Sequence, residues 1–78
     1  MAIEAFVLIN VSVDHTKSAY KTITRMSGVK EVYAVTGVYD IIAHVEAEDI
    51  NTLSDLIVSK IRAIDGVTRT MTCISLNV

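Results

Sequence analysis

The chain has 78 residues and a mass of 8.5 kDa, which fits one small domain, because chains divide into separate cores only well above ~200 residues. Apolar residues make up 51% of it and charged residues 21%, with a mean hydropathy of +0.47, which excludes both disorder and a membrane span. The formal net charge of -2 argues against direct binding of nucleic acid, which usually requires a basic patch. We therefore expect a single folded domain over residues 1–78 that contacts neither nucleic acid nor membrane.

Cysteine usage and the first residues favour a cytoplasmic protein. The single cysteine, Cys73, has no partner for an internal disulfide, and we expect it to be a small buried residue of the last strand. Glu4 interrupts the first apolar run and no basic cluster precedes it, which predicts neither a signal peptide nor an anchor. We expect no metal and no cofactor, because no Cys/His cluster has ligand spacing and the three glycines fit no phosphate-binding motif.

β-Branched residues predict a strand-rich domain, since Val, Ile and Thr contribute 11, 10 and 8 residues and such side chains are enriched in strands. Residues 3–12 are apolar and β-branched, and the run is short enough for a first strand. An N-cap at Asp14 and a terminal Gly28 then predict a helix over residues 14–27. The apolar face of this helix comprises Ala19, Ile23 and Met26.

Two β-rich runs, residues 29–36 and 39–47, follow this helix with only Gly37-Val38 between them. A two-residue connection that contains glycine is typical of a hairpin. A further β-rich run, residues 67–78, is predicted to form the last strand. One face of that strand carries Thr68, Thr70, Thr72, Ile74, Leu76 and Val78.

A second helix is predicted between the hairpin and the last strand. Asp49 provides its N-cap and Gly66 its end, and its apolar residues recur at intervals of three and four. These residues are Ile50, Leu53, Ile57, Ile61 and Ile64. Both helices end in an apolar residue, a spacer and Gly-Val, at residues 26–29 and 64–67, which indicates two pseudo-equivalent halves.

The element order is β-α-β-β-α-β, which predicts a ferredoxin-like α+β sandwich: a four-stranded antiparallel sheet with both helices on one face. The first strand places Phe6 and Leu8 on the side away from the helices, so part of that side is too apolar to face water. Covering ~400 Å² of apolar surface per subunit would contribute ~10 kcal/mol before the entropy of association is subtracted. We therefore expect a homodimer that pairs sheet to sheet, a dimeric α/β-sandwich.

Catalytic constellations are scarce in this sequence. His15 falls in a predicted first helical turn and His44 in a predicted strand, and neither has a Cys, Ser or carboxylate at a telling distance. Lys17, Lys21 and Arg25 form a basic stripe on the first helix, which we interpret as a solvated face.

The hairpin connection, residues 35–40, concentrates groups that suit recognition of a small zwitterion. It offers backbone N–H groups, a hydroxyl, a phenol and a carboxylate within a few residues. A free amino acid needs N–H donors for its carboxylate, acceptors for its ammonium and an apolar wall for its side chain. In the alternative interpretation Gly37 only permits the hairpin and Asp40 satisfies amides of the turn. The residues alone leave both interpretations open.

Three segments together resemble the effector-binding domain of the Lrp/AsnC (feast/famine) transcription regulators. They are Gly28-Val29 with Val32, Thr36-Gly37-Val38-Tyr39-Asp40, and Gly66-Val67-Thr68-Arg69-Thr70-Met71-Thr72. The likeness covers nearly the whole chain and implies the RAM fold, dimerisation through the sheets, and octameric rings that bind amino-acid effectors between dimers. Regulators of this family carry an N-terminal helix-turn-helix, whereas this sequence begins at the first strand of the sensor, so it resembles a stand-alone RAM protein.

The resemblance also implies a set of ligand-binding residues. Backbone groups at Gly37 and Val38 would meet the effector carboxylate, and Asp40 would hold its ammonium or order the loop. Thr70 and Thr72 would contribute from the last strand. The other matched residues of the hairpin motif are Thr36 and Tyr39. The family often has a polar residue where this chain has Val38, so a side-chain contact from that position is not expected.

These observations predict a non-catalytic module that senses a free amino acid, forms dimers and octamers, and influences transcription only by joining full-length Lrp/AsnC regulators. One alternative is a small dimeric α+β-barrel enzyme, with His44 and Tyr39 as the acid and base. Another is a purely structural oligomerisation module, in which Asp40 and the threonines only satisfy hydrogen bonds.

Overall fold

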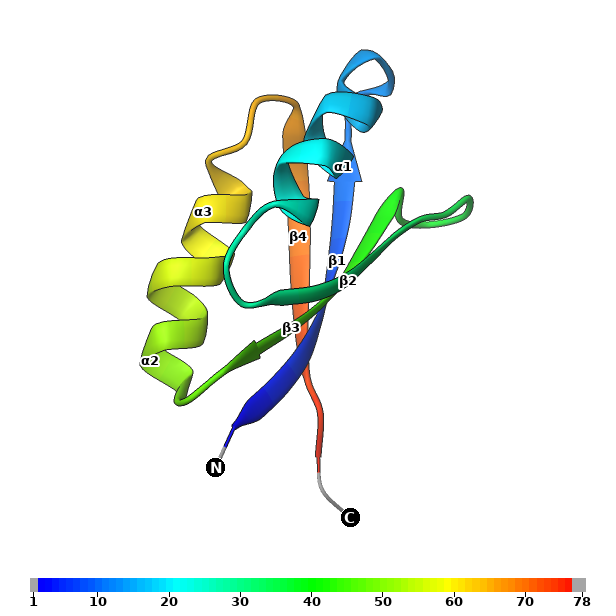
Figure 1. Ribbon diagram of the computed structural model, residues 1–78. Coiled ribbons are helices and arrows are strands. Elements are labelled where there is room, and N and C mark those ends of the chain that lie inside the picture. The colour runs from blue at the N-terminus through cyan, green and yellow to red at the C-terminus, as the bar shows by residue number, and fades with distance from the viewer. Residues whose placement is uncertain (1, 77–78) are drawn as a thin grey trace.

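The computed structural model describes residues 2–76, except for the side chain of Leu56. Its strands form one antiparallel sheet in the order β2-β3-β1-β4, and the helices pack against that sheet (Figure 1). This is the ferredoxin-like α+β arrangement that the sequence predicts. In chain order the elements are β1 (Ile3–Val11), the 3-10 turn η1 (Val13–His15), α1 (Thr16–Thr24), β2 (Val29–Ala34), β3 (Ile41–Ala47), α2 (Ile50–Thr52), the π-helical segment η2 (Leu53–Val58), α3 (Ser59–Arg62) and β4 (Val67–Ile74).

The face of the sheet that the helices cover forms the core. Every second residue of β1 from Ala5 to Val11 is buried, as is every second residue of β3 from Ile41 to Ala47. The helices cover these residues with Ala19, Ile23, Leu53, Ile57 and Ile61. No polar or charged side chain of the described residues is buried, so this core is held by the removal of apolar surface from water.

The first helix begins later than the sequence predicts. Asp14 lies inside η1 and does not cap the helix; the N-cap position of α1 belongs to His15, whose side chain makes no capping bond. The prediction of a cap at Asp14 is therefore wrong. The reason is that the His15 N–H donates to the Ser12 carbonyl at 2.9 Å, so a 3-10 turn satisfies the first N–H groups through the backbone.

The second helix is continuous through α2, η2 and α3 (Figure 1). Its N-cap is confirmed, because the Asp49 carboxylate accepts the Thr52 N–H at 2.7 Å. Ile50 is 53% exposed, although its spacing placed it on the apolar face. Ile50 is the first residue of α2, directly after the cap and before the π segment begins at Leu53.

The turns that follow the two helices have the same backbone conformation, as their repeated sequence suggested. Gly28 and Gly66 have φ values of 91° and 90°, and in each turn the N–H of the next valine donates back to the residue two before the glycine. At Gly66 an added Cβ would also collide with the imidazole ring of His15. Glycine is therefore required there by both the backbone angle and the neighbouring ring.

The connection between β2 and β3 is longer than predicted. The two-residue turn at Gly37-Val38 is instead the six-residue loop 35–40, closed by the Val35 N–H donating to the Asp40 carbonyl at 2.8 Å. The Asp40 N–H donates to the Ile9 carbonyl at 2.9 Å, which draws this residue from the hairpin to β1. The last strand is shorter than predicted and ends at Ile74; of its predicted residues, 77–78 lie outside the described part.

The opposite face of the sheet, which we call the helix-free face, carries exposed apolar side chains. Phe6, Tyr33 and Met71 are 41%, 48% and 45% exposed. Cys73 is also exposed, so the prediction that it is buried is wrong; it pairs with Phe6 on this face, where no helix of the chain covers it. In the part of the chain that the structure describes, no helix has the length and apolar character needed to cross a bilayer.

Candidate functional site

Side chains hold the loop 35–40 against the end of β1. Asp40 Oδ2 accepts the backbone N–H of Val11 at 3.0 Å and Asn10 Nδ2 at 3.3 Å. The same Asn10 amide donates to the Val38 carbonyl at 2.8 Å. These contacts give the Asp40 carboxylate a loop-ordering role through one oxygen, and no described residue bonds to its Oδ1.

The tip of this loop projects into solvent. Thr36, Gly37 and Val38 are exposed, and an added Cβ at Gly37 would meet nothing within 4 Å. Gly37 has a φ of 137°, a conformation that side chains rarely adopt. Tyr39 points away from the tip, and its hydroxyl lies 3.6 Å from the sulfur of Met71 on the helix-free face. The exposed tip therefore offers mainly backbone groups and the Val38 side chain.

Thr70 and Thr72 lie apart from the loop within one chain. Ile9 pairs with Ile41 on one side and with Thr70 on the other. Thr70 therefore lies at the end of the sheet where the loop joins β3, but about 10 Å from Ile41 across β1. Thr72 lies two residues further along β4. Both threonines share the helix-covered side with Ile9, whereas Tyr39 lies on the helix-free side. Within one chain, residues 36–40 thus lie together, whereas Thr70 and Thr72 lie apart from them.

Two recesses mark the surface around these elements. The first, of about 480 Å³, is mainly polar and is lined by Arg62, Val67, Thr68, Arg69 and Thr70. The second, of about 540 Å³, is an apolar groove between α1 and β2, lined by Val13, Thr16, Lys17, Tyr20, Val32, Tyr33 and Ala34. Residues 36–40 line neither of these two recesses.

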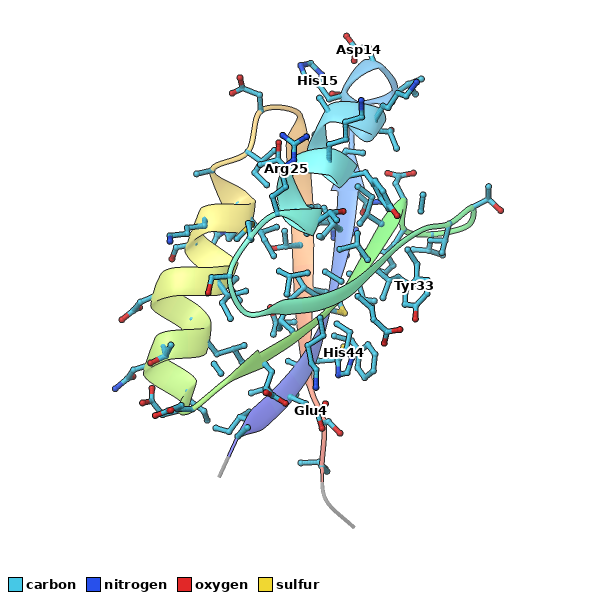
Figure 2. The ribbon with its side chains drawn as sticks, viewed as in Figure 1. Glu4, Asp14, His15, Arg25, Tyr33 and His44 are labelled. Atoms are coloured by element: carbon cyan, nitrogen blue, oxygen red, sulfur yellow. The ribbon has the colours of Figure 1, made fainter. Side chains whose placement is uncertain are left out.

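A chain of polar side chains crosses the helix-free face (Figure 2). His44 Nε2 lies 2.9 Å from Glu4 Oε1, and His44 Nδ1 lies 3.5 Å from Glu31 Oε1. The other oxygen of Glu31 accepts the Tyr33 hydroxyl at 2.8 Å. The imidazole stacks on Phe6 with ring centroids 4.7 Å apart and planes 11° apart, which leaves its side chain 17% exposed.

These contacts set the charges on this face. The hydrogen bond from Tyr33, followed by that from His44, lowers the pKa of Glu31, and the hydrogen bond to Glu31 raises the pKa of Tyr33. Glu31 is therefore ionised and Tyr33 protonated at neutral pH. Because Glu4 and Glu31 face opposite nitrogens of the ring, they cannot bind one metal together with His44, and the described residues contain no other group of three suitable ligands.

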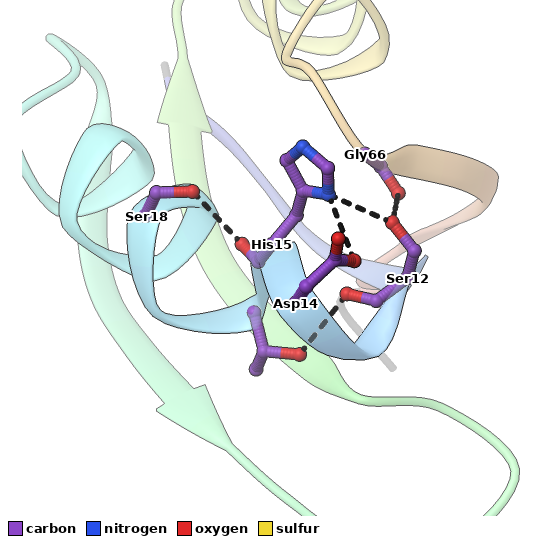
Figure 3. Close-up of polar contacts among 6 residues, drawn as sticks. Ser12, Asp14, His15, Ser18 and Gly66 are labelled. Atoms are coloured by element: carbon purple, nitrogen blue, oxygen red, sulfur yellow. Dashed lines mark hydrogen bonds and ion pairs between the residues drawn. The ribbon is translucent and has the colours of Figure 1, made fainter.

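The second histidine takes part in a contact that resembles a catalytic triad only in composition (Figure 3). His15 Nδ1 lies 3.0 Å from Ser12 Oγ and 3.2 Å from Asp14 Oδ1. A proton relay needs serine and aspartate on opposite nitrogens, whereas here both contact the same one. Ser12 also donates its backbone N–H to the Gly66 carbonyl at 2.9 Å. The cluster therefore ties the start of the first helix to the Gly66 turn.

Several of these contacts have little signal in the sequence. Asn10 holds the loop, and its only signal in the sequence is an amide side chain within an apolar run. Glu4 and Glu31 contact His44 across three strands, and no local spacing connects them because strand register sets the contact. Met71 likewise meets Tyr39 only through the pairing of β4 with β1.

The chain is similar to proteins of a known family in both sequence and fold. Residues 4–78 match the family described as the Lrp/AsnC ligand binding domain. The chain belongs to the Lrp/AsnC family. The protein TTHA0845 from Thermus thermophilus is 36% identical with a TM-score of 0.90, over 97% of this chain and 95% of that one. E. coli AsnC is 30% identical with a TM-score of 0.88, over 96% of this chain and 51% of AsnC. The fold of this Lrp/AsnC chain thus corresponds to about half of that regulator.

The Lrp/AsnC chain is also similar to part of an enzyme. Homocitrate synthase of Saccharolobus islandicus is 42% identical over 72 residues, which is 88% of this chain but 15% of the enzyme. Homocitrate synthase of Sulfurisphaera tokodaii is 40% identical over 62 residues, or 13% of its length. The chain therefore spans only a small part of these curated relatives.

Proposed function

We propose that the chain is a non-catalytic module, extending over residues 1–78, that binds a free amino acid and oligomerises in the cytoplasm. The observation that carries the proposal is the ordered loop 35–40 in a chain of the Lrp/AsnC ligand-binding family. The loop tip is exposed, and Asp40 retains an oxygen without a described partner. Both are needed if a ligand is to dock on the loop.

Each charged group of an amino acid has a partner in this arrangement. Backbone N–H groups at Gly37 and Val38 would bind the carboxylate, and Asp40 Oδ1 would accept from the ammonium. Thr36 and Tyr39 would flank the ligand. Thr70 and Thr72 would act from β4 of a neighbouring copy, because those of the same chain lie across β1. The complete pocket in this proposal is thus shared between subunits.

Oligomerisation would begin with two copies that pair through their helix-free faces. Phe6 and Met71 are large and exposed there, and Leu8 and Ile42 are half-buried beside them. Pairing these faces removes apolar surface from water, which the chain's own helices do only on the other side. The dimers would assemble into an octamer, in which contacts between dimers complete the ligand pockets. The same contacts would admit full-length Lrp/AsnC regulators.

Thermal-shift measurement with each of the twenty amino acids tests the ligand. One of them at a hundred times its Kd should add about 2.7 kcal/mol to the free energy of unfolding. Asp40→Asn should reduce that shift, while Asp55→Asn, an exposed acid on the second helix, should not. A flat response to all twenty would favour the purely structural module and remove amino-acid binding from the proposal.

The single cysteine provides a probe for the dimer. Cys73 is exposed on the helix-free face, so its reaction with a thiol reagent should slow as protein concentration rises and copies pair. Sedimentation over the same range should show a species of twice 8.5 kDa. Leu8→Glu should abolish both effects, because an ionised carboxylate would be buried in the apolar interface. Full thiol reactivity in a dimer would place the interface elsewhere.

A second candidate is an effector-sensing module that controls an enzyme instead of transcription. The similarity of 42% to one segment of homocitrate synthase favours it. Mixing the chain with a purified homocitrate synthase and, separately, with a full-length Lrp/AsnC regulator would distinguish the two. A change in enzyme turnover that depends on the bound amino acid supports the second candidate, and a change in DNA retention by the regulator supports the first.

The enzymatic alternative gains no support from the geometry. His44 contacts two carboxylates, whereas Tyr39 contacts Met71, so the proposed acid and base have separate partners. Neither lines the two recesses described above.

A further inference from the structure

His44 lies at the centre of a polar chain that crosses three strands of the helix-free face (Figure 2). Glu4 comes from β1, His44 from β3, and Glu31 and Tyr33 from β2. The imidazole is mostly covered, because Phe6 stacks on it from β1. This polar chain thus lies within the surface that the proposed dimer buries.

The two carboxylates face different nitrogens of the His44 ring. Glu4 contacts Nε2 at 2.9 Å and Glu31 faces Nδ1 at 3.5 Å. A neutral imidazole has a single N–H, so it donates to one carboxylate and turns a lone pair toward the other. A protonated imidazole donates to both. Both contacts are therefore satisfied only when His44 carries a proton, and imidazole side chains change charge between about pH 5 and 8.

Other charged groups on this face do not replace that proton. Lys30 pairs with Glu46 at 3.3 Å. Tyr33 already donates to Glu31, and the lowered pKa of Glu31 keeps its carboxylate ionised over the range in which histidines titrate. The remaining titratable or charged side chains there are Tyr39, Arg69 and Cys73, which lie near or on β4. His44 is thus the group whose protonation would place a positive charge between Glu4 and Glu31.

Pairing of two faces would take water away from this chain. An ionised carboxylate that loses water without gaining a donor is destabilised, and two such groups brought together across an interface also repel each other. We propose that two copies pair through the helix-free face more tightly when His44 is protonated, so that dimerisation takes up protons. This inference rests on the proposed dimer and adds its regulation by pH.

The size of the effect follows from the symmetry of the pair. In a two-fold dimer each copy presents the same surface, so both His44 side chains enter the interface and up to two protons are taken up. By linkage, the association constant should rise about tenfold or more when the pH falls from about 8.5 to about 6. Below about pH 5 the trend should stop, because the carboxylates themselves begin to take up protons.

Sedimentation equilibrium of the full chain at several pH values and constant ionic strength measures this. Wild type should show the rise described, and His44→Gln, which keeps a hydrogen-bonding side chain without the charge, should have a pH-independent Kd. Glu31→Gln should tighten the dimer at about pH 8.5 and reduce the pH dependence, because a neutral ring then satisfies the one remaining carboxylate. His15→Gln is the matched control and should retain the wild-type dependence, since His15 lies in η1 beside Asp14.

The outcomes separate this inference from the proposed function. A dimer that protects Cys73 but has the same Kd at every pH would overturn the role of His44 and leave the dimer intact. Wild-type pH dependence in His44→Gln would also overturn it. A chain that stays monomeric at every pH would overturn both. Circular dichroism at each pH confirms that the variants are folded before their association is compared.

Discussion

The two faces of the sheet use the same alternation of residues for different purposes. On the helix-covered face, Val7, Ile9 and their neighbours on β3 are fully buried, and no polar side chain of the described residues is buried with them. On the helix-free face, Glu4 and Asn10 flank Phe6 and Leu8 along the same strand, and acids and a histidine lie among the apolar side chains. The helix-covered face thus supplies the buried core, and the helix-free face is the one that the proposed dimer would cover.

The difference between the two faces predicts that truncating neighbouring residues of β1 lowers the free energy of unfolding by very different amounts. Ile9→Ala removes a fully buried side chain and should lower the free energy of unfolding by about 2–5 kcal/mol. Leu8→Ala, on the half-buried opposite side, should cost only about 1 kcal/mol in the monomer and should weaken dimerisation. Urea denaturation at concentrations low enough to keep the chain monomeric measures both. Equal losses would show that the helix-free face packs against part of its own chain.

The turn before β4 offers the next largest effect, because it returns the chain from the helical layer to the sheet. Gly66→Ala places a Cβ in a left-handed conformation and against the His15 ring, and should destabilise by about 2 kcal/mol or more. Gly37→Ala, at a positive φ but in open space, should cost about 1 kcal/mol. Thermal unfolding of both variants, of His15→Gly, and of Gly66→Ala combined with His15→Gly checks this. The loss caused by Gly66→Ala should be smaller in the His15→Gly background, because the His15 Cβ that the added methyl group would meet is then absent.

Much of the fold was readable because its signals are local. The alternation in β1, the positive-φ glycine turns after both helices and the cap at Asp49 each depend on residues close in sequence, and the structure confirms them. The helices themselves end earlier than predicted, α1 at Thr24 and α3 at Arg62. The predictions fail where a contact between distant residues, or the position of a residue in its element, determines the local structure. Asp40 lengthens the hairpin loop by bonding to β1, and Ile50, the first residue of α2, is exposed although its spacing predicts burial.

The candidate site was less predictable than the fold. The residues of the loop were identified, since they are consecutive, but their anchor Asn10 lies about 30 residues away and was not. Thr70 and Thr72 share one face as expected, yet they lie across β1 from the loop, and Thr68 falls at the irregularity opposite Asn10 and Val11. A pocket formed between copies depends on quaternary contacts, which leave no spacing in the sequence of one chain.

Asn10 lies where the helix-free face meets the loop, so it tests whether that face also orders the site. Asn10→Ala removes the bonds to the Val38 carbonyl and to Asp40, and should lower the free energy of unfolding by about 1–2 kcal/mol. Hydrogen exchange should become faster in residues 36–40 and stay unchanged in the second helix. Asn51→Ala, an exposed amide on α2, is the control. Unchanged exchange in the loop would show that Asp40 alone orders it.

Acid titration gives the smallest effect and compares a carboxylate of the helical layer with those of the helix-free face. The backbone N–H of Thr52 lowers the pKa of Asp49 from its ordinary value of 3.8. A lowered pKa stabilises the fold above that value, and the contribution is lost as the pH falls through the folded-state pKa. Asp49→Asn keeps a good cap without a charge, so its stability should decline less than that of wild type between about pH 5 and 3.

Glu31→Gln should also reduce the loss of stability between about pH 5 and 3, because the pKa of Glu31 is lowered too. In the proposed pH-dependent dimer, only Glu31→Gln should in addition alter dimerisation between about pH 6 and 8.5, where Asp49 stays ionised and Glu31 faces His44. Urea titrations of the monomer and sedimentation of the dimer measure the two effects separately. An effect of Asp49→Asn on dimerisation in that range would contradict the division of roles between the two faces.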